Sequence, residues 1–337
     1  MSGPGSKPLL DWVLLRHPET PRGRAKQWIV SGRVSIRGQI IRRPQELIPD
    51  PGPGLELGGR RATTLDCGSG WKIHPRLSVL YLDHALAVVD KGPGLLSVPG
   101  PRDEPSALGV LADVLSGRLA PRDRAAARRS VPAAYRALQP LPVHRLDQYT
   151  SGALCIAMNP AARESLIDQV RSHRMNRVYI AYVEGRPKSP RGTWRDWVQL
   201  SEDELRQEIV PRTSRGSGPP PTEAVTHYEV LAEYPLGRGG LFAAKLRIRL
   251  ETGLKHQIRA QAAHAGLPLI GDRAYNPGAR RSAPALPCLA FERQALHAES
   301  LALEHPDRPG ATVSWSVELP RDLRRLEAGL VGWKGGR

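Results

Sequence analysis

The segment from residue 242 to residue 250 limits the possible folds more than any other part of the chain. From Lys245 to Leu250, basic and aliphatic residues alternate without a break. Because successive side chains of a strand point to opposite faces, this alternation predicts a strand with one face on a core and the other in solvent. Half-buried strands of this kind are typical of antiparallel sheets.

Other predicted elements follow one another in an irregular order. A helix is expected over 160–173, where Asn159 can cap the first turn and Leu166 lies on an apolar stripe. We also expect a helix over 107–115 and strands over 79–83, 85–90, 153–157, 179–183 and 224–232. Neither a repeat nor a strand–helix–strand period relates these segments. The pattern therefore favours an α+β fold with a largely antiparallel mixed sheet.

The first 61 residues are predicted to form a small α/β unit. Helices are expected over 9–15 and 21–30, followed by a strand over 33–37. This part holds 11 Lys+Arg against 5 Asp+Glu, and so carries +6 of the chain's net charge of +16. The charges follow the second helix and the next strand, which favours an RNA-binding surface over evenly solvated charge. The residues that we expect to bind RNA are Arg24, Lys26, Arg33 and Arg37.

The chain is expected to divide into four parts. At 337 residues it is long for a single core and suits one large and one small domain. A Gly/Ser-containing stretch over 62–76 is predicted as a linker between the N-terminal unit, 1–61, and a large domain, 77–320. The remaining residues, 321–337, are predicted to form a basic, solvated helix and tail.

The composition restricts the partners and the compartment. A pI of about 10.4 indicates a polyanionic partner, because each phosphate that is neutralised releases counterions; an Arg-rich proteome is the alternative. The cysteines Cys67, Cys155 and Cys288 form no CxxC pair, so neither a disulfide framework nor a zinc site is expected. No apolar run approaches the roughly 20 residues of a membrane span, and residues 1–5 do not read as a secretory signal. We therefore expect a cytoplasmic protein that does not bind a membrane.

The segment over 143–152, Val-His-Arg-Leu-Asp-Gln-Tyr-Thr-Ser-Gly, carries the most chemistry. His144, Arg145 and Asp147 bring an imidazole, a guanidinium and a carboxylate into four residues of a loop before a strand. Loops held by rigid strands are common positions for catalytic groups. The alternative is structural: Arg145 and Asp147 pair with each other and the residues after them close a turn. The residues alone leave both interpretations open.

This segment resembles the signature of the RluA family of pseudouridine synthases, in which His-Arg-Leu-Asp is followed by Thr-Ser-Gly. Other stretches are similar to motifs of the same family in type and order, and the resemblance spans residues 78–319. These stretches are Tyr81–Asp83 with Lys91–Leu95, Arg177–Ala181, Leu250–Gly253 with His256–Arg259, Gly271–Tyr275, and Leu296–Ala298. The helix–turn–strand order of residues 1–61 is similar to the S4-type RNA-binding module; a generic small α/β cap is the alternative.

The resemblance implies a pseudouridine synthase fold and the isomerisation of uridine in RNA. It assigns catalysis to Asp147, which acts either as a nucleophile or as a base on the sugar. It further implies that Arg145 fills the space left by a flipped base, that Tyr179 stacks on the uracil, and that Arg259 pairs with Asp147. The reaction consumes nothing external, so no cofactor is expected. A metal site is not expected either, because His256 and His264 are too far apart for the i, i+4 zinc pattern.

The chain departs from the family in two places. The early turn has Gly92 between Lys91 and Pro93, and the second departure lies just before His256. The family usually reads Thr-Gly-Arg-Thr-His-Gln-Ile-Arg, whereas Leu254 and Lys255 stand in the middle here, which affects the expected RNA contacts of this loop. An S4-like unit with basic flanks favours ribosomal RNA as the substrate, with transfer RNA as the alternative. A non-catalytic RNA-binding or ribosome-assembly factor, and a hydrolase that uses Asp147, are the rival functions. A monomer is expected.

Overall fold

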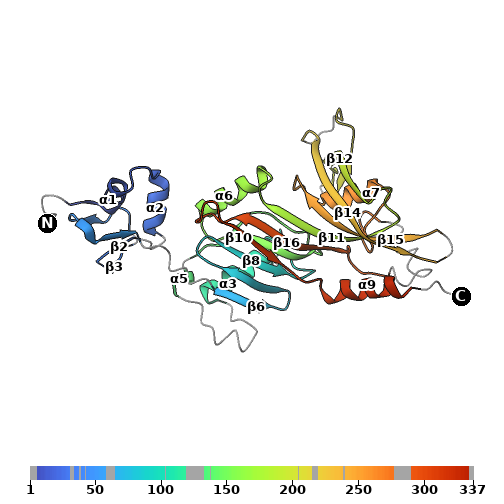
Figure 1. Ribbon diagram of the computed structural model, residues 1–337, viewed down its shortest axis with the longest axis horizontal. Coiled ribbons are helices and arrows are strands. Elements are labelled where there is room, and N and C mark those ends of the chain that lie inside the picture. The colour runs from blue at the N-terminus through green and yellow to red at the C-terminus, as the bar shows by residue number, and fades with distance from the viewer. Residues whose placement is uncertain are drawn as a thin grey trace. The chain divides into compact units, whose positions relative to one another are not determined.

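The chain forms two compact units, residues Met1–Thr64 and Leu65–Arg337 (Figure 1). The division lies close to the boundary expected after residue 61. No helix among the described residues has the length and apolar character needed to cross a membrane. The computed structural model describes residues 6–30, 34–37, 39–41, 43–57, 65–102, 104–118, 133–136, 138–203, 205–214, 219–237, 240–276 and 290–333.

The first unit packs two helices on short strands. Its core consists of apolar side chains from both helices, among them Leu10, Val13 and Ile29, closed by Val34 and Leu55 from the strands. Both helices and the strand after them agree with the ranges expected from the sequence. The elements are β1 (Lys7–Pro8), α1 (Leu9–Arg16), α2 (Arg22–Val30), β2 (Val34–Ile36), β3 (Gln39–Ile40), β4 (Leu47–Ile48), a 3₁₀ turn (Gly52–Gly54) and β5 (Leu55–Leu57).

The second unit is built on one twelve-stranded sheet, ordered β13-β12-β14-β15-β11-β16-β10-β8-β7-β6, with β17 beside β16 and β9 beside β10. Among the described strand pairs of this sheet, β10 and β16 run parallel and the others antiparallel, so the expected α+β class with a largely antiparallel mixed sheet is confirmed. The strands are β6 (Leu65–His74), β7 (Leu77–Leu82), β8 (Leu86–Lys91), β9 (Leu141–Pro142), β10 (Ser151–Ala157), β11 (Asn176–Glu184), β12 (Arg191–Leu200), β13 (Gln207–Ile209), β14 (Thr222–Pro235), β15 (Phe242–Leu250), β16 (Leu296–Glu304) and β17 (Thr312–Ser316).

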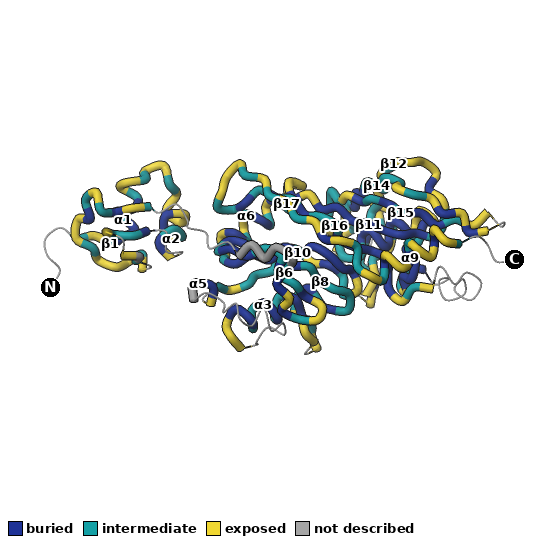
Figure 2. Tube along the Cα trace, turned by 60° about the horizontal axis from the view of Figure 1, so that its bottom comes forward, coloured by how far each residue is buried: buried dark blue, intermediate teal, exposed yellow. Residues whose placement is uncertain are grey.

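Helices cover both faces of this sheet. On one face, α3 (Ala107–Ser116) and the start of α7 (Gln257–His264) contribute side chains to the largest apolar cluster. On the other face, α6 (Pro160–Arg171) covers the half around β8 and β10, and α9 (Arg321–Gly332) covers the half around β11 and β15. Figure 2 shows the buried strands running through the middle of this unit. A further described helix is α5 (Ala133–Arg136).

Local chemistry explains several of these elements. In α6, the Asn159 side chain accepts a hydrogen bond from the Ala162 amide at 2.9 Å, as expected of an N-cap. In β15, Leu246 and Ile248 are fully buried, whereas Arg249 is exposed, so the alternation noted in the sequence is present. All seven residues of β10 are buried, which makes it a central strand.

The structure differs from the sequence-based expectations in two segments, 62–76 and the C-terminal helix. The expected linker over 62–76 contains β6, whose Trp71 and Ile73 side chains are buried in the core. The Gly-Ser-Gly stretch that indicated a linker lies inside this strand, beside a register shift between Asp66 and Trp71, and glycines in strands often mark such bulges.

The C-terminal helix is not solvated on all sides. In α9, Leu323, Leu326 and Leu330 are buried against the sheet, a helical spacing that places them on one face. Glu327 in the same helix accepts hydrogen bonds from Tyr182 at 2.9 Å and from Lys245 at 2.7 Å. The high charge of this segment concealed its apolar stripe, and α9 is part of the large unit.

Candidate active site

The loop that holds Asp147 is fixed from both sides. The Ser97 hydroxyl donates to the Leu146 carbonyl at 2.7 Å and accepts from the Leu146 amide at 2.9 Å. The Leu146 side chain is buried in the core, and the Thr150 amide closes a turn onto the Asp147 carbonyl at 3.0 Å. Because Leu146 points inward, the neighbouring Arg145 is exposed and the Asp147 carboxylate faces a cleft.

Lys91 anchors the loop that carries Asp147 through hydrogen bonds to backbone carbonyls. Its ammonium group is fully buried and donates to the carbonyls of Gln148 at 3.0 Å, Leu95 at 2.9 Å and Gly92 at 3.2 Å. Burial lowers the Lys91 pKa to about 7, against the opposing effect of the nearby Asp147 charge. The lysine therefore joins the turn before α3 to the loop that carries the carboxylate.

The end of the loop passes close to β16. Gly152 has φ +114°, and a Cβ atom there would lie 2.1 Å from the Ala298 carbonyl oxygen, so a side chain would collide with the backbone. Next to it, the Ser151 hydroxyl pairs with Nδ1 of buried His297 at 3.0 Å, and Nε2 of His297 pairs with the Val317 carbonyl at 3.1 Å. A carbonyl can only accept, so Nε2 carries the proton and Nδ1 accepts from Ser151. These contacts explain why a Ser-Gly pair follows the loop.

Asp147 forms an ion pair with Arg259 of helix α7. The Arg259 Nη1 lies 3.2 Å from Asp147 Oδ2, while Nε and Nη2 donate to Asp272 at 2.6 and 2.8 Å. Asp272 is fully buried and also accepts from the Ala274 amide at 3.0 Å. The guanidinium is therefore fixed by a bidentate pair on one side and presents its remaining edge to Asp147. Burial alone would lower the Arg259 pKa, but the two carboxylates together raise it above its usual value.

His256 approaches the other carboxylate oxygen of Asp147. Its Nε2 is 3.8 Å from Asp147 Oδ1, and its Nδ1 is 3.2 Å from the Tyr275 hydroxyl. That hydroxyl already accepts from the Gln207 amide at 2.7 Å, so its proton points to Nδ1 and the imidazole proton lies on Nε2, toward Asp147. Burial lowers the His256 pKa to about 4 despite the nearby Asp147. The ring is therefore neutral near pH 7.

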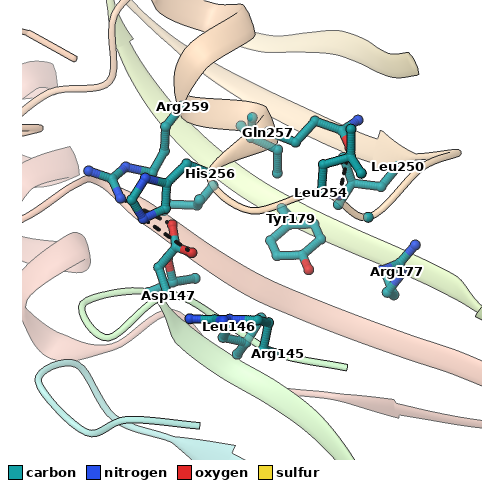
Figure 3. Close-up of a pocket in the computed structure, with 14 residues that line it drawn as sticks. Arg145, Leu146, Asp147, Arg177, Tyr179, Leu250, Leu254, His256, Gln257 and Arg259 are labelled. Carbon is teal, nitrogen blue, oxygen red and sulfur yellow. Dashed lines mark hydrogen bonds and ion pairs between the residues drawn. The ribbon is translucent and has the colours of Figure 1, made fainter. Parts of the chain in front are cut away.

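The cleft beside Asp147 is drawn in Figure 3. Tyr179 of β11 lies on its floor with its ring between Asp147 and Arg177, and the exposed Arg145 lies at its lower edge. Burial raises the Tyr179 pKa, and Asp147 adds to this effect while Arg177 opposes it. The phenol is therefore protonated. Its aromatic ring lines the cleft.

The turn before α7 forms the far wall of the cleft. Gln257 accepts from the Leu254 amide at 3.0 Å and from the Thr252 hydroxyl at 2.8 Å, and donates to the Thr226 hydroxyl at 2.9 Å. Leu254, one of the two residues that depart from the family pattern, lines the cleft with its side chain. The departure therefore changes the wall of the cleft and leaves the Asp147–Arg259 pair intact.

The structure brings together four residues that were expected in the site: Arg145, Asp147, Tyr179 and Arg259 all line this cleft. Of the basic residues expected to bind RNA, Arg24, Lys26 and Arg37 are exposed on the N-terminal unit, and Arg33 lies outside the described residues. Within the described part of the chain, no group of three or more His, Cys, Asp or Glu side chains could hold a metal ion.

Sequence reasoning assigned no role to several residues of the site. Asp272 stands in the Gly271–Tyr275 motif, but its pairing with Arg259 depends on the tertiary fold. Arg177 carried a visible signal, since it lies two positions before Tyr179 on a strand and so shares its face. Lys91 stands at the start of the Lys91–Leu95 motif, but its role as a buried anchor was not assigned. Arg293 lies outside every motif; it donates to the Tyr149 carbonyl at 3.0 Å and pairs with Asp322 at 2.7 Å.

Comparison with known proteins identifies the family of the chain. The family model of RNA pseudouridylate synthases matches residues 85–264. Curated relatives are named ribosomal large subunit pseudouridine synthase D: the protein of Xanthomonas campestris pv. campestris is 31% identical over 323 residues (93% of this chain, 86% of the relative). The protein of Yersinia pestis is 28% identical over 319 residues, covering 92% of this chain and 86% of the relative.

Solved structures show the same fold. Human RNA pseudouridylate synthase domain containing 4 matches with a TM-score of 0.55 at 22% identity, over 75% of this chain and 92% of that one. Human RNA pseudouridylate synthase domain containing 1 matches with a TM-score of 0.51 at 23% identity, over 75% and 87%. The large unit therefore has the fold of a pseudouridine synthase, and since the family model spans more than half of the sequence, the chain belongs to the RNA pseudouridylate synthase family.

Proposed function

We propose that the protein isomerises uridine to pseudouridine in ribosomal RNA of the large subunit, with Asp147 as its catalytic residue. One observation carries this proposal: the Asp147 carboxylate is held at a cleft by Arg259, 3.2 Å away, with the flat ring of Tyr179 beside it. The names of the relatives, which specify the ribosomal large subunit, support this class of RNA.

The reaction requires a charged group beside the sugar. The bond between ribose C1′ and uracil N1 breaks and its electron pair stays with the base, which leaves positive charge at C1′. The base then turns, C5 bonds to C1′, and the C5 proton is lost as N1 gains one. Arg259 holds the Asp147 carboxylate in the cleft through an ion pair of 3.2 Å, where the carboxylate can compensate the charge at C1′.

Two further residues handle the RNA. A base inside folded RNA must leave its stack before it can enter the cleft, at a cost of a few kcal/mol. Arg145 is exposed at the rim of the cleft, where it can occupy the space that the base leaves. Tyr179 presents its ring to the cleft, where it can stack on the flipped uracil.

The N-terminal unit would act as an S4-like RNA-binding domain. Arg24 and Lys26 on α2 and Arg37 after β2 are exposed, as phosphate contacts require. That the protein acts as a monomer is part of this proposal. Because the curated relatives are bacterial proteins named for the ribosomal large subunit, and bacterial ribosomes assemble in the cytoplasm, we propose a cytoplasmic location.

Two rival functions remain distinguishable. A non-catalytic assembly factor would have no chemical need for a carboxylate held between Arg259 and an accessible cleft. A hydrolase that uses Asp147 would normally need a second carboxylate in the cleft. Asp272, the described carboxylate that shares Arg259 with Asp147, is fully buried and does not line the cleft. Transfer RNA as the substrate is the alternative within the same chemistry.

The deciding experiment maps pseudouridines by selective chemical labelling in cells with and without the gene, and in cells that carry only Asp147→Asn. We expect one or more ribosomal RNA positions to lose the label without the gene and to stay unlabelled with the variant. Loss of label in transfer RNA alone would correct the substrate. Unchanged labelling in every RNA would refute the enzymatic function.

A further inference from the structure

Arg177 is a buried cation for which the described structure supplies no anion. It lies on β11, and 6% of its surface is exposed. Its Nε is among the buried nitrogen atoms without a hydrogen-bond partner. The ion pairs of the described residues do not include it, whereas Arg259, the other buried guanidinium of the cleft, is paired with both Asp147 and Asp272.

Such an arrangement is costly unless a ligand completes it. Removing a charged group from water requires a partner charge or several hydrogen bonds in return. Gly253 leaves room for the guanidinium, because a Cβ atom at this glycine would lie 2.7 Å from Arg177 Nη1. The side chain lines the same cleft as Asp147 and Tyr179. An acceptor that enters this cleft would therefore relieve an unpaired buried donor.

The positions of Asp147, Tyr179 and Arg177 in the cleft indicate which acceptor Arg177 would bind. Arg177 and Tyr179 are two positions apart on one strand and share a face. In Figure 3, Asp147 lies on one side of the Tyr179 ring and Arg177 on the other. Both charges affect the Tyr179 pKa, in opposite directions. A base on this ring thus has one end at the carboxylate and the other at the guanidinium.

The chemistry of uracil fits this order. The ribose C1′ must approach Asp147, so N1 of the base lies at the Asp147 end. The C4 carbonyl stands opposite N1 across the six-membered ring, and therefore points away from Asp147. We propose that Arg177 donates hydrogen bonds to the uracil carbonyl that lies across the ring from the glycosidic bond, and so recognises uridine and stabilises the departing base. This inference rests on the proposed function.

The same contact can form with the uracil of the substrate and with the rotated uracil of the product. When the ring turns so that C5 takes the place of N1, C2 takes the place of C4, and a carbonyl again faces Arg177. Between these states the base holds the electron pair of the broken bond, with negative charge shared by O2 and O4, so the cation binds it more strongly than it binds uridine. Cytosine would present an amino donor at C4 instead, which a guanidinium cannot accept.

The first test uses Arg177→Gln with synthetic RNA that carries 4-thiouridine at the mapped target. Sulfur is a weaker acceptor than oxygen, so the substitution should slow the parent enzyme by roughly 10-fold or more and the variant by no more than about 2-fold. On normal RNA, Arg177→Gln should be roughly 10- to 100-fold slower than the parent. Equal effects of 4-thiouridine on both enzymes would overturn the proposal.

Two controls distinguish a contact with the base from a contact with the RNA backbone and from a general loss of positive charge. Arg186→Gln removes an exposed, ion-paired arginine and should keep the parent response. A neutral methylphosphonate on either side of the target tests for a phosphate contact: if it slows the parent and not Arg177→Gln, Arg177 binds the backbone and the proposal fails.

Arg177→Lys keeps the charge but not the planar fork, and replaces the glutamine variant in all assays if that variant does not fold.

A binding measurement keeps this test independent of turnover. The parent should bind uridine 5′-monophosphate about 10-fold more tightly than cytidine 5′-monophosphate in NMR titrations, and Arg177→Gln should bind both alike. An unchanged ratio in the variant would overturn the role of Arg177. A parent that prefers uridine 5′-monophosphate but converts no RNA would instead refute the proposed function and leave the recognition of the base standing.

Discussion

Asp147 and Arg259 are 112 positions apart in the sequence, and their side chains meet at 3.2 Å. Arg259 can hold this carboxylate in place because Asp272 binds the opposite edge of the same guanidinium at 2.6 and 2.8 Å. One cation therefore serves a buried carboxylate and an accessible one. The buried pair fixes the geometry, and the accessible carboxylate remains available to a substrate.

Asp147→Asn tests the catalytic assignment. The amide keeps the shape of the side chain but removes the charge, so single-turnover formation of pseudouridine should fall by about 10⁴-fold, or about 5.5 kcal/mol of barrier at 1.36 kcal/mol per decade. RNA affinity in filter binding should stay within about 3-fold. Asp168→Asn, on the exposed surface of α6, is the control. More than a tenth of the parent rate in Asp147→Asn would exclude Asp147 as the catalytic group.

Asp272→Asn tests the positioning of Arg259. The substitution removes the charge partner of a buried guanidinium, and breaking such a pair typically costs about 3–5 kcal/mol of folding free energy. The melting temperature should therefore drop by several degrees, and the rate should fall even at temperatures where the variant is folded. Asp168→Asn removes an exposed pair and should change stability by less than about 1 kcal/mol. Parent-like stability and rate for Asp272→Asn would show that Arg259 needs no second carboxylate.

Lys91 predicts a pH dependence of stability. Its pKa is about 7 in the folded protein, against 10.5 when exposed. Between these values the unfolded chain binds the proton and the folded protein does not, so this group adds stability as the pH rises above 7 and loses it as the pH falls. Denaturant unfolding of the parent, compared with Lys91→Met, should show a relative gain of about 2 kcal/mol from pH 7 to pH 9. Parallel stability curves would mean that Lys91 stays charged in the fold.

The N-terminal charges should control affinity and leave the chemical step alone. Each phosphate contact that is lost lowers the slope of log affinity against log salt by about 0.7–0.9. Combining Arg24→Gln, Lys26→Gln and Arg37→Gln should therefore reduce this slope by about 2 and weaken RNA binding, while saturating RNA restores the parent single-turnover rate. Deletion of residues 1–64 should act in the same direction. If neither change alters affinity or slope, the unit serves as a structural cap; loss of chemistry at saturation would place it in the active site.

Removal of metal ions should not affect the chemistry. The isomerisation is redox-neutral, and its proposed groups are the side chains of Asp147, Tyr179 and Arg259. Single-turnover rates should be unchanged after exhaustive chelation, provided that a spermidine-containing buffer keeps the RNA folded. A rate that collapses on chelation and returns with zinc would contradict this mechanism.

Much of the fold could be predicted because its signals are local. The strict alternation over 242–250 predicted β15 with the observed bounds, and Asn159 marked the start of α6. These features depend on neighbouring residues alone. The prediction failed where one local pattern is compatible with two structures: the glycines of β6 indicated a linker, and the charges of α9 outweighed its three leucines, although both segments pack on the sheet.

For the site, the sequence indicated the residues that we propose for the chemistry, and the tertiary structure decided what each of them faces. Asp147 stood out in its motif, as did Tyr179 and Arg259. That Asp272 holds Arg259, and that no described carboxylate pairs with the buried Arg177, follows from the tertiary fold, which brings β11, α7 and the Asp147 loop to one cleft. The electrostatic partners of a residue depend on distance in space and on burial, and neither quantity can be derived from the spacing of residues along a chain.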